Sequence, residues 1–381
     1  MSELASRPRA NSLSQIQADA WSRRDERISE INAQWSARLD GATKPPPAKA
    51  VEWPAEWPSR RAPPAAVEPV TNAGGSLPLS ESVEAIPNGR AAGLSAYCAT
   101  VVQKAGADFA GPMYIVDLGA AERLLEAWRI AFPRIEPRYA VKCFPDSQLI
   151  KALSDKGCGF DCASEKEARL ALDAGCPASR IVFANPCKLP SDIAFLHASG
   201  IALTTFDCID ELDKLMKTNC RVLLRIRADD AASRLPFGAK YGCLEGEIKN
   251  LIEACADRNI RLCGVAFHVG SGARSPKAFA DAVALSKRVF DLHATLRPHA
   301  TPLDVLDVGG GFCGGFSDDG HAAVSASGDC TVVDALNEAL ATYFPANEYP
   351  SLQVIAEPGR YFAEASAALC CRVVGSRSRE L

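Results

Sequence analysis

The sequence predicts an α/β fold in which eight parallel strands, each followed by a helix, close into a TIM-type (β/α)8 barrel. From about residue 112 onward, short runs rich in β-branched residues alternate with longer amphipathic stretches. That alternation is typical of repeated β-α units around a parallel sheet. Polar or glycine residues also recur where the short runs end, and reactive groups of such a barrel lie at the carboxyl ends of its strands.

The elements are expected in a regular order along the chain. A leading strand is expected at 113–116, and barrel strands at 138–142, 159–162, 181–184, 202–206, 222–226, 263–268, 305–308 and 354–356. Helices are expected at 147–154, 165–174, 209–217, 245–258, 276–293 and 333–343. The residues at the strand ends are Lys142, Asp161, Asn185, Asp207, Arg225, His268, Gly309 and Glu357.

Composition narrows the class of protein. The chain has 381 residues, 48% of them apolar, and a net charge of -4, which argues against a nucleic-acid surface. Its apolar runs are short, so no membrane span is expected, and no secretory signal is recognised at the start. The 15 cysteines are scattered through apolar runs, as reduced thiols are, and neither disulfides nor a metal site are expected. A cytoplasmic location follows.

The chain is expected to divide into four segments. Residues 1–90 are interpreted as a mostly disordered extension, because prolines interrupt them after one possible helix within 13–39. A lead-in segment occupies 91–112, and the barrel occupies 113–362. Residues 363–381 are expected to begin a second domain, made of β-strands.

Lys142 and Glu357 each follow a strand-like run and supply two ionisable groups. Burial at a strand end depresses the pKa of a lysine and prepares the amine to react with an aldehyde; otherwise the ammonium extends to solvent. Pro358 and Gly359 end the strand after Glu357 and orient its carboxylate. That carboxylate could keep a pyridine nitrogen protonated, or form a structural ion pair with Arg360.

An anion cradle is predicted at Gly309, Gly310 and Gly311. Three successive glycines expose backbone N–H groups to a phosphate, although a flexible turn explains them equally well in isolation. Ser271 and Arg360 offer a hydroxyl and a guanidinium, which both match phosphate oxygens; Arg360 could instead pair with a surface carboxylate. The glycine spacing is neither a dinucleotide fingerprint nor a P-loop.

Three further strand-end residues have a functional and a structural interpretation. His268 could stack its flat ring on a planar cofactor, or it could be a hydrogen-bonded core histidine. Asp161 and Arg225, taken alone, are more often structural charges. The whole set supplies the groups needed to hold a phosphorylated aromatic aldehyde and draw electrons into its ring. The sequence therefore predicts pyridoxal 5'-phosphate as the cofactor.

Taken together, these stretches resemble the eukaryotic ornithine decarboxylase family, which has an alanine-racemase-like barrel and belongs to the fold type III (group IV) pyridoxal-phosphate decarboxylases. The resemblance covers roughly residues 112–375. It is carried, in the family's order, by YAVKC, GFDCASEKE, RIVFANPCK, TTFD, LLRI, FHVGSG, DVGGGF and IAEPGRYF. The forms FDCAS and ANPCK favour the ornithine branch over diaminopimelate and biosynthetic arginine decarboxylases.

The resemblance implies decarboxylation of L-ornithine to putrescine, in polyamine biosynthesis, by a homodimer. Lys142 would form the Schiff base, His268 would stack on the ring, and Glu357 would pair with the ring nitrogen. Lys240 resembles the end of a mobile loop near the dimer interface. The cofactor-binding set implied by the resemblance is Lys142, Asp161, Arg225, His268, Ser271, Gly309, Gly310, Gly311, Glu357, Gly359 and Arg360.

The chain departs from the family pattern in two places. Phe144 follows YAVKC where the family usually has asparagine, which changes the hydrogen bonds expected beside Lys142. The sequence ends at Leu381, shortly after AEPGRYF, whereas family members continue into a C-terminal β-domain that supplies an active-site Cys-Asp loop across the dimer. The chain is therefore expected to be truncated before that domain, which supports cofactor binding more than turnover.

Two other functions fit part of the pattern. A catalytically impaired relative that binds an antizyme-like regulator, as antizyme inhibitors do, would account for the missing C-terminal half. Retention of Lys142, Glu357 and Arg360 favours an enzyme instead. An amino-acid racemase on the same barrel would generally place an arginine at the ring nitrogen, so Glu357 argues against it.

Overall fold

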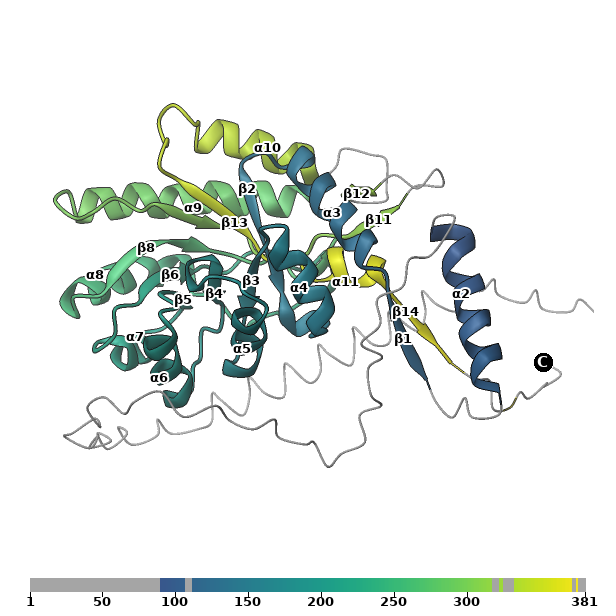
Figure 1. The fold of residues 1–381 in the computed structure, drawn as a ribbon. Coiled ribbons are helices and arrows are strands. Elements are labelled where there is room, and N and C mark those ends of the chain that lie inside the picture. Colours follow the sequence, from purple (N-terminus) through teal and green to yellow (C-terminus); the bar gives the residue numbers. More distant parts are fainter. Residues whose placement is uncertain (1–89, 107–111, 317–321, 325–331, 372–374, 376–381) are drawn as a thin grey trace, which may run out of the picture. The chain divides into compact units, whose positions relative to one another are not determined.

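Eight parallel strands close into a barrel in the computed structural model of this protein (Figure 1). Each of the eight predicted runs forms one of these strands, so the predicted fold class is confirmed. Around the barrel the order is β10 (Val305–Asp307), β13 (Gln353–Ala356), β2 (Ile135–Ala140), β3 (Gly159–Cys162), β4 (Ile181–Phe183), β5 (Leu203–Phe206), β6 (Arg221–Arg225) and β8 (Arg261–Ala266).

The structure describes residues 90–106, 112–316, 322–324, 332–371 and 375. They all belong to one unit, Val83–Leu381. The predicted extension and its possible helix, at 1–89, lie outside the described residues. The segment boundaries given above remain predictions.

Helices surround the strands and connect them. The six predicted helices form at α4 (Ser147–Asp155), α5 (Glu165–Asp173), α7 (Ile209–Leu215), α8 (Ile248–Asp257), α9 (Pro276–Leu296) and α10 (Val332–Tyr343). A short 3-10 turn, η4 (Glu245–Glu247), precedes α8, and two others are η2 (Val141–Cys143) and η3 (Ala178–Arg180). Figure 1 shows α9 and α10 side by side on the outside of the barrel.

Four helices were not predicted: α2 (Arg90–Ala105), α3 (Leu118–Ala131), α6 (Pro190–Ser199) and α11 (Arg360–Ser366). The signals for α3 are present in the sequence. Asp117 caps its first turn by accepting a hydrogen bond from the backbone of Ala120, as N-cap residues do. Leu124 and Trp128 lie four residues apart on its buried face, which is the spacing of an amphipathic helix.

Three small two-stranded ribbons accompany the barrel. The predicted leading strand, β1 (Met113–Val116), pairs antiparallel with β14 (Ala367–Cys370). Near the carboxyl ends of the barrel strands, β7 (Ser233–Leu235) pairs with β9 (Ser271–Ala273). The third ribbon joins β11 (Gly314–Phe316) to β12 (Ala322–Val324).

The core has two layers because successive strand residues face opposite sides of the sheet. In β6, Leu223 belongs to the cluster inside the barrel, whereas Val222 and Leu224 belong to the cluster between strands and helices. The outer layer includes packed aromatic rings, with Trp128 and Phe312 in edge contact at 4.8 Å between centroids. Two filled layers hold the strand ends in fixed positions.

Two sequence expectations concern chemistry outside the core. Among the described residues, no helix is both long and apolar enough to cross a membrane. Every cysteine in the described part of the chain is a free thiol, and half of them are buried. Burial raises the pKa of thiols such as Cys158, Cys243, Cys255 and Cys263 to about 12, which keeps them protonated and unreactive.

Candidate functional site

The residues predicted at the strand ends all lie at one end of the barrel. Lys142 is in η2, directly after β2, and Asp161 is the third residue of β3. His268 follows β8, and Glu357 follows β13. Because parallel strands end on the same side of a barrel, their side chains form one cluster. The placement agrees with the sequence prediction, and the role of each residue remains a proposal.

Lys142 forms an ion pair with the carboxylate of Asp161, across the neighbouring strands β2 and β3. Asp161 is fully buried, whereas the Lys142 side chain is 48% exposed. The other carboxylate oxygen of Asp161, Oδ1, has no hydrogen-bond partner among the described residues. The amine is therefore both anchored and accessible from outside the protein.

The prediction that burial depresses the pKa of Lys142 is wrong for this arrangement. Burial alone would lower that pKa, but the charges of Asp161 and Glu357 outweigh it and raise the value above that of a free lysine. Sequence spacing could not show this, because Asp161 and Glu357 reach Lys142 from other strands. The ammonium form is therefore stabilised until another positive charge takes its place.

Two buried carboxyl groups lie at the ends of adjacent strands: Asp307 is the last residue of β10, and Glu357 follows β13. Burial and the proximity of Asp307 raise the pKa of Glu357 to about 8. Burial also raises the pKa of Asp307 to about 7, although a hydrogen bond of 2.9 Å from the backbone N–H of Gly309 opposes that rise. Asp307 was not singled out from the sequence, although it precedes the glycine run.

The glycine run Gly309 to Gly311 turns tightly against the strand ends. A Cβ atom on Gly309 would lie 2.1 Å from the carbonyl oxygen of Phe267, and one on Gly310 would lie 2.7 Å from Nε2 of His268. Gly309 and Gly311 have φ values of 64° and 105°, which favour glycine. The run needs glycine for its conformation, and because the N–H of Gly309 already donates to Asp307, the N–H groups of Gly310 and Gly311 are the candidate donors to a small anion.

Ser271 and Arg360 meet beside this run. Arg360 Nε donates a 2.7 Å hydrogen bond to Ser271 Oγ, and the guanidinium also lies 3.9 Å from Glu364. The sequence also allowed a structural ion pair between Glu357 and Arg360. In the structure, Arg360 contacts Ser271 and Glu364 instead. The Arg360 side chain is 26% exposed, so it retains donors for a phosphate.

His268 is half-buried, and its Nδ1 accepts a 3.0 Å hydrogen bond from the backbone of Gly270. The edge of the Phe237 ring contacts the imidazole, with 4.8 Å between centroids. Burial and the positive charge of Arg225 hold the pKa of His268 well below its usual value. The ring is therefore neutral and fixed in orientation, as a stacking group requires.

Arg225 ends β6 beneath aromatic rings from the loop that follows. Its guanidinium lies 4.8 Å from the ring centre of Tyr241 and 5.9 Å from that of Phe237. Such cation–π contacts hold a charged side chain in place. Lys240, predicted to end a mobile loop, places its ammonium 4.8 Å from the same Tyr241 ring. Neither aromatic residue was singled out from the sequence.

Gly359 and Phe144 position the backbone near Lys142. A Cβ on Gly359 would lie 3.1 Å from the Cβ of Cys143 and 3.3 Å from that of Ala140, so glycine allows close packing there. The carbonyl of Phe144 accepts a 2.9 Å hydrogen bond from the hydroxyl of Tyr139. Because this bond uses the backbone of residue 144, it does not require an asparagine side chain.

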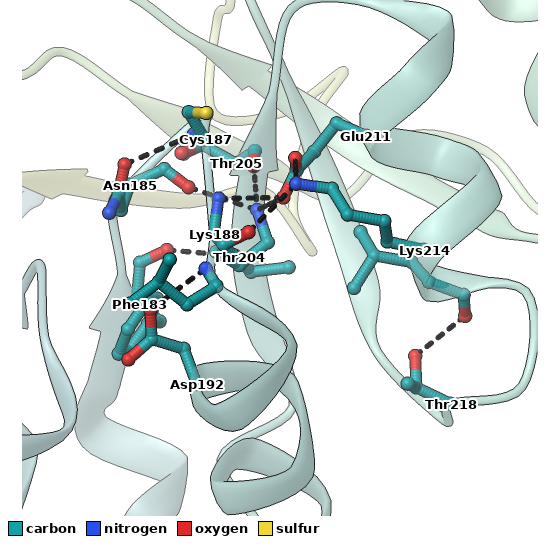
Figure 2. Close-up of polar contacts among 12 residues, drawn as sticks. Phe183, Asn185, Cys187, Lys188, Asp192, Thr204, Thr205, Glu211, Lys214 and Thr218 are labelled. Carbon is teal, nitrogen blue, oxygen red and sulfur yellow. Dashed lines mark hydrogen bonds and ion pairs between the residues drawn. The ribbon is translucent and has the colours of Figure 1, made fainter. Parts of the chain in front are cut away.

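A second lysine lies at the strand ends, within the ANPCK motif. Figure 2 shows Lys188 Nζ donating hydrogen bonds of 2.9 and 2.8 Å to the carbonyls of Asn185 and Thr205. Its ammonium also pairs with Glu211 at 2.8 Å, and both side chains are almost fully buried. Lys214 pairs with the other oxygen of Glu211. The ammonium of Lys188 and both carboxylate oxygens of Glu211 have partners, although the Thr205 hydroxyl has none, so these two charged groups are already occupied.

The residues around Lys142 fit a phosphorylated aromatic aldehyde. An accessible amine would bind the aldehyde, and the glycine N–H groups with Arg360 would bind the phosphate. One buried oxygen of Asp161 and one of Asp307 have no described hydrogen-bond partner, so this end of the barrel has acceptors left for a donor. By contrast, no group of three histidine, cysteine or acidic residues in the described part of the chain could hold a metal ion.

Comparison with known proteins agrees with this chemistry. The family model of the pyridoxal-binding domain of pyridoxal-dependent decarboxylases matches residues 118–364. The chain is 38% identical over 324 residues to a protein of Nicotiana glutinosa named ornithine decarboxylase, chloroplastic, covering 83% of this chain and 71% of that one. It is 39% identical over 266 residues to the ornithine decarboxylase of Schizosaccharomyces pombe, covering 69% of this chain and 57% of that one.

Solved structures show the same fold. The arginine decarboxylase of Paramecium bursaria Chlorella virus superposes with a TM-score of 0.68 at 34% identity, covering 75% of this chain and 74% of that one. The ornithine decarboxylase of Entamoeba histolytica superposes with a TM-score of 0.62 at 26% identity, covering 75% and 77%. This chain therefore belongs to the pyridoxal-dependent decarboxylases, and its barrel is a pyridoxal phosphate-binding domain.

Proposed function

We propose that this protein decarboxylates L-ornithine to putrescine, the first diamine needed for polyamine synthesis. The observation that carries the proposal is the placement of an accessible lysine, Lys142, against a buried carboxylate beside a glycine-rich anion cradle. The choice of ornithine rests on relatives of 38–39% identity whose names specify ornithine. The solved relatives include enzymes named for arginine, lysine and ornithine, so the fold alone does not select the substrate.

Pyridoxal phosphate, when bound, supplies the electron-withdrawing ring that stabilises negative charge on the substrate carbon after carbon dioxide leaves. The residues of the chain hold that group and control its protons. Lys142 would be its covalent attachment point, because its amine is accessible and held by Asp161. Glu357 would pair with the ring nitrogen and keep it protonated, because the positive charge of the ring would offset the burial and the proximity of Asp307 that raise the pKa of Glu357 in its absence.

The remaining residues bind and orient. Ser271, Arg360 and the backbone of Gly310 and Gly311 would hold the phosphate by charge-assisted hydrogen bonds. His268 would cover one face of the ring with a neutral imidazole. A neutral imidazole suits this position, because a positively charged His268 would repel the protonated ring that Glu357 is proposed to stabilise.

The partners and the location of the protein are also proposals. The similarity to ornithine decarboxylases supports a homodimer, in which Lys240 and the rings around Arg225 would lie near the neighbouring subunit. Free thiols throughout the described residues support a cytoplasmic location. An antizyme-like protein is the proposed regulatory partner.

One assay tests the substrate. Carbon dioxide release from carboxyl-labelled ornithine is measured with lysine and arginine as matched controls, using the protein saturated with cofactor. The proposal expects the highest kcat/KM for ornithine. A higher kcat/KM for lysine or arginine would change the proposed substrate but leave the proposed decarboxylation in place.

The alternative function is a catalytically impaired homologue that acts as an antizyme-inhibitor-like binding protein. It predicts no carbon dioxide release from any of the three amino acids. It also predicts tight binding to an antizyme, measured by calorimetry with the purified proteins. Release of carbon dioxide that is lost in Lys142→Ala would exclude this alternative.

A further inference from the structure

A cavity of about 290 Å³ lies at the end of the barrel opposite to Lys142. Its walls come from the last turns of α8 and α9, the loops that follow them, and the start of β8. Leu262 lines the cavity at the start of β8, whereas His268, in the site described above, follows the end of that strand. The cavity is therefore separate from the cofactor site.

His293 is a buried polar residue in an apolar position. The inward face of α9 is otherwise almost entirely apolar, and His293 continues it one turn after Val289 and Phe290. The side chain is only 5% exposed and lines the cavity. No hydrogen bond to its imidazole is described, and the imidazole is not among the buried polar groups left without a partner, so its nitrogens open into the cavity. A ligand that enters the cavity can therefore replace water at the imidazole.

The charge in the cavity is positive. Arg297 lines it one turn beyond His293, and no described carboxylate pairs with its guanidinium. Arg261 also lines it, but Asp304 occupies that guanidinium with a 2.7 Å hydrogen bond. Burial and the charge of Arg297 hold the pKa of His293 below its usual value. A neutral His293 would offer one N–H donor and one acceptor.

The C-terminal ends of α8 and α9 also border the cavity, but they do not cancel its preference for an anion. Helix C-termini normally repel anions, but here backbone amides already occupy exposed carbonyls. The carbonyl of His293 accepts a 2.8 Å bond from Arg297 N–H, and that of Cys255 accepts a 2.9 Å bond from Ile260 N–H. The side chains that remain without described partners are the amide of Asn259 and the hydroxyl of Thr301, which both line the cavity.

We propose that this cavity is a second binding site, which takes a small oxyanion, the carboxylate or phosphate group of a metabolite-sized compound. Arg297 supplies the charge, and His293, Asn259 and Thr301 supply neutral hydrogen bonds. The volume lies at the lower limit of ligand sites, which start at about 300 Å³, so a large cofactor is excluded. Diamines and basic amino acids are also excluded, because two arginines line the walls.

The test uses nuclear magnetic resonance of the full chain labelled with ¹⁵N-histidine and saturated with pyridoxal phosphate. Five histidines are present, and His293→Asn assigns the His293 signals. Inorganic phosphate and succinate are titrated separately at constant ionic strength against sodium chloride. The proposal expects saturable shifts of the His293 signals and a rise in the His293 pKa, because a bound anion stabilises the imidazolium form.

Matched arginine variants test the mechanism of binding. Arg297→Gln should weaken binding about tenfold or more, since charge-assisted hydrogen bonds are the strong ones and tenfold corresponds to about 1.4 kcal/mol. Arg288→Gln is the control, because Arg288 lies on the same helix but is 59% exposed and pairs with Glu245. Circular dichroism verifies folding, and Thr301→Val provides a milder variant should Arg297→Gln unfold.

Each outcome decides the proposal. Stronger binding of phosphate indicates a phosphate ester as the natural ligand, and stronger binding of succinate indicates a carboxylate. Shifts that do not saturate with either anion would overturn the site, as would equal binding by Arg297→Gln and Arg288→Gln. The His268 signals report on the cofactor site independently. A failure of the proposed decarboxylase function would therefore not change what the His293 signals show about the cavity.

Discussion

Two lysines at the same end of the barrel form ion pairs with buried carboxylates, yet they have opposite properties. The Lys142 side chain is 48% exposed and its partner Asp161 is fully buried. The Lys188 side chain is 0% exposed, and its partner Glu211 is 2% exposed. Burial and the nearby Lys214 lower the pKa of Lys188 despite Glu211, whereas Asp161 and Glu357 raise that of Lys142 against the effect of burial.

The difference lies in how many hydrogen bonds are completed. Lys188 uses its three ammonium protons on two carbonyls and a carboxylate (Figure 2), and Lys214 occupies the second oxygen of Glu211. Lys142 contacts one oxygen of Asp161, and the other has no described partner. A complete network fixes structure, and an incomplete one remains available for chemistry. Four predictions test this contrast.

The largest effect is expected at Lys142. Lys142→Ala should abolish covalent cofactor binding and reduce carbon dioxide release to background, because Lys142 is the exposed amine that the buried carboxylate of Asp161 holds at these strand ends. Visible absorbance of the dialysed protein and the decarboxylase assay measure both effects. Retained absorbance after dialysis would show that another amine holds the cofactor.

Lys188→Met should instead destabilise the fold. Removing one partner from a buried ion pair costs about 3–5 kcal/mol in free energy of unfolding, measured by urea denaturation. The double variant Lys188→Met/Glu211→Leu should regain part of this loss, since apolar residues often replace a buried pair at little cost. A loss below about 1 kcal/mol in free energy of unfolding is typical of exposed ion pairs. It would contradict the structural role of Lys188 and so its contrast with Lys142.

Gly310→Ala should weaken cofactor binding without abolishing the attachment at Lys142. The added Cβ would lie 2.6 Å from the carbonyl of Glu357 and 2.7 Å from His268 Nε2, so the cradle must shift. Overpacking of this kind costs about 1–3 kcal/mol, which corresponds to a rise of about 5- to 150-fold in the cofactor Kd. Gly246→Ala is the control, because no atom lies within 4 Å of the Cβ it adds.

The smallest effect concerns stability and pH. Glu357 and Asp307 have pKa values of about 8 and about 7 in the folded protein, against ordinary values of 4.5 and 3.8. Between those limits the folded state binds more protons than the unfolded state. The free energy of unfolding of the cofactor-free protein should therefore fall as pH rises from about 4 to about 8.

Glu357→Gln should flatten that fall by at most about 1.4 kcal/mol per pH unit, while Glu165→Gln on the surface of α5 leaves it unchanged. Urea denaturation at several pH values measures the slope. A slope that is identical in Glu357→Gln and the wild type would show that Glu357 ionises normally. Its assignment to the ring nitrogen would then lose its basis.

Much of the fold followed from the sequence because each barrel strand is a short apolar run ended by a polar residue or glycine. Helices α3, α6 and α11 did not follow. The short α11 begins directly after Pro358 and Gly359, which normally signal a break in structure. Prolines also mark the start of α6, at Pro190, where a proline fits the first turn.

The site followed from the sequence less completely than the fold did. Lys142, Asp161 and Glu357 were recognised by position, but their mutual effect on pKa depends on distances across strands. The rings of Phe237 and Tyr241 come from a loop without a periodic pattern, so their contacts with Arg225 and His268 could not be read from spacing. Lys188 shows the converse, because its sequence position resembles that of Lys142 and only its burial reveals a structural role.

Borohydride reduction of the protein with bound pyridoxal phosphate, followed by peptide mass mapping, tests the central contrast most directly. The account predicts one pyridoxyl group per chain, located on Lys142, with Lys188 unmodified because its amine is buried and fully bonded. Label on Lys188, or no label at all, would contradict the assignment of Lys142 as the reactive amine.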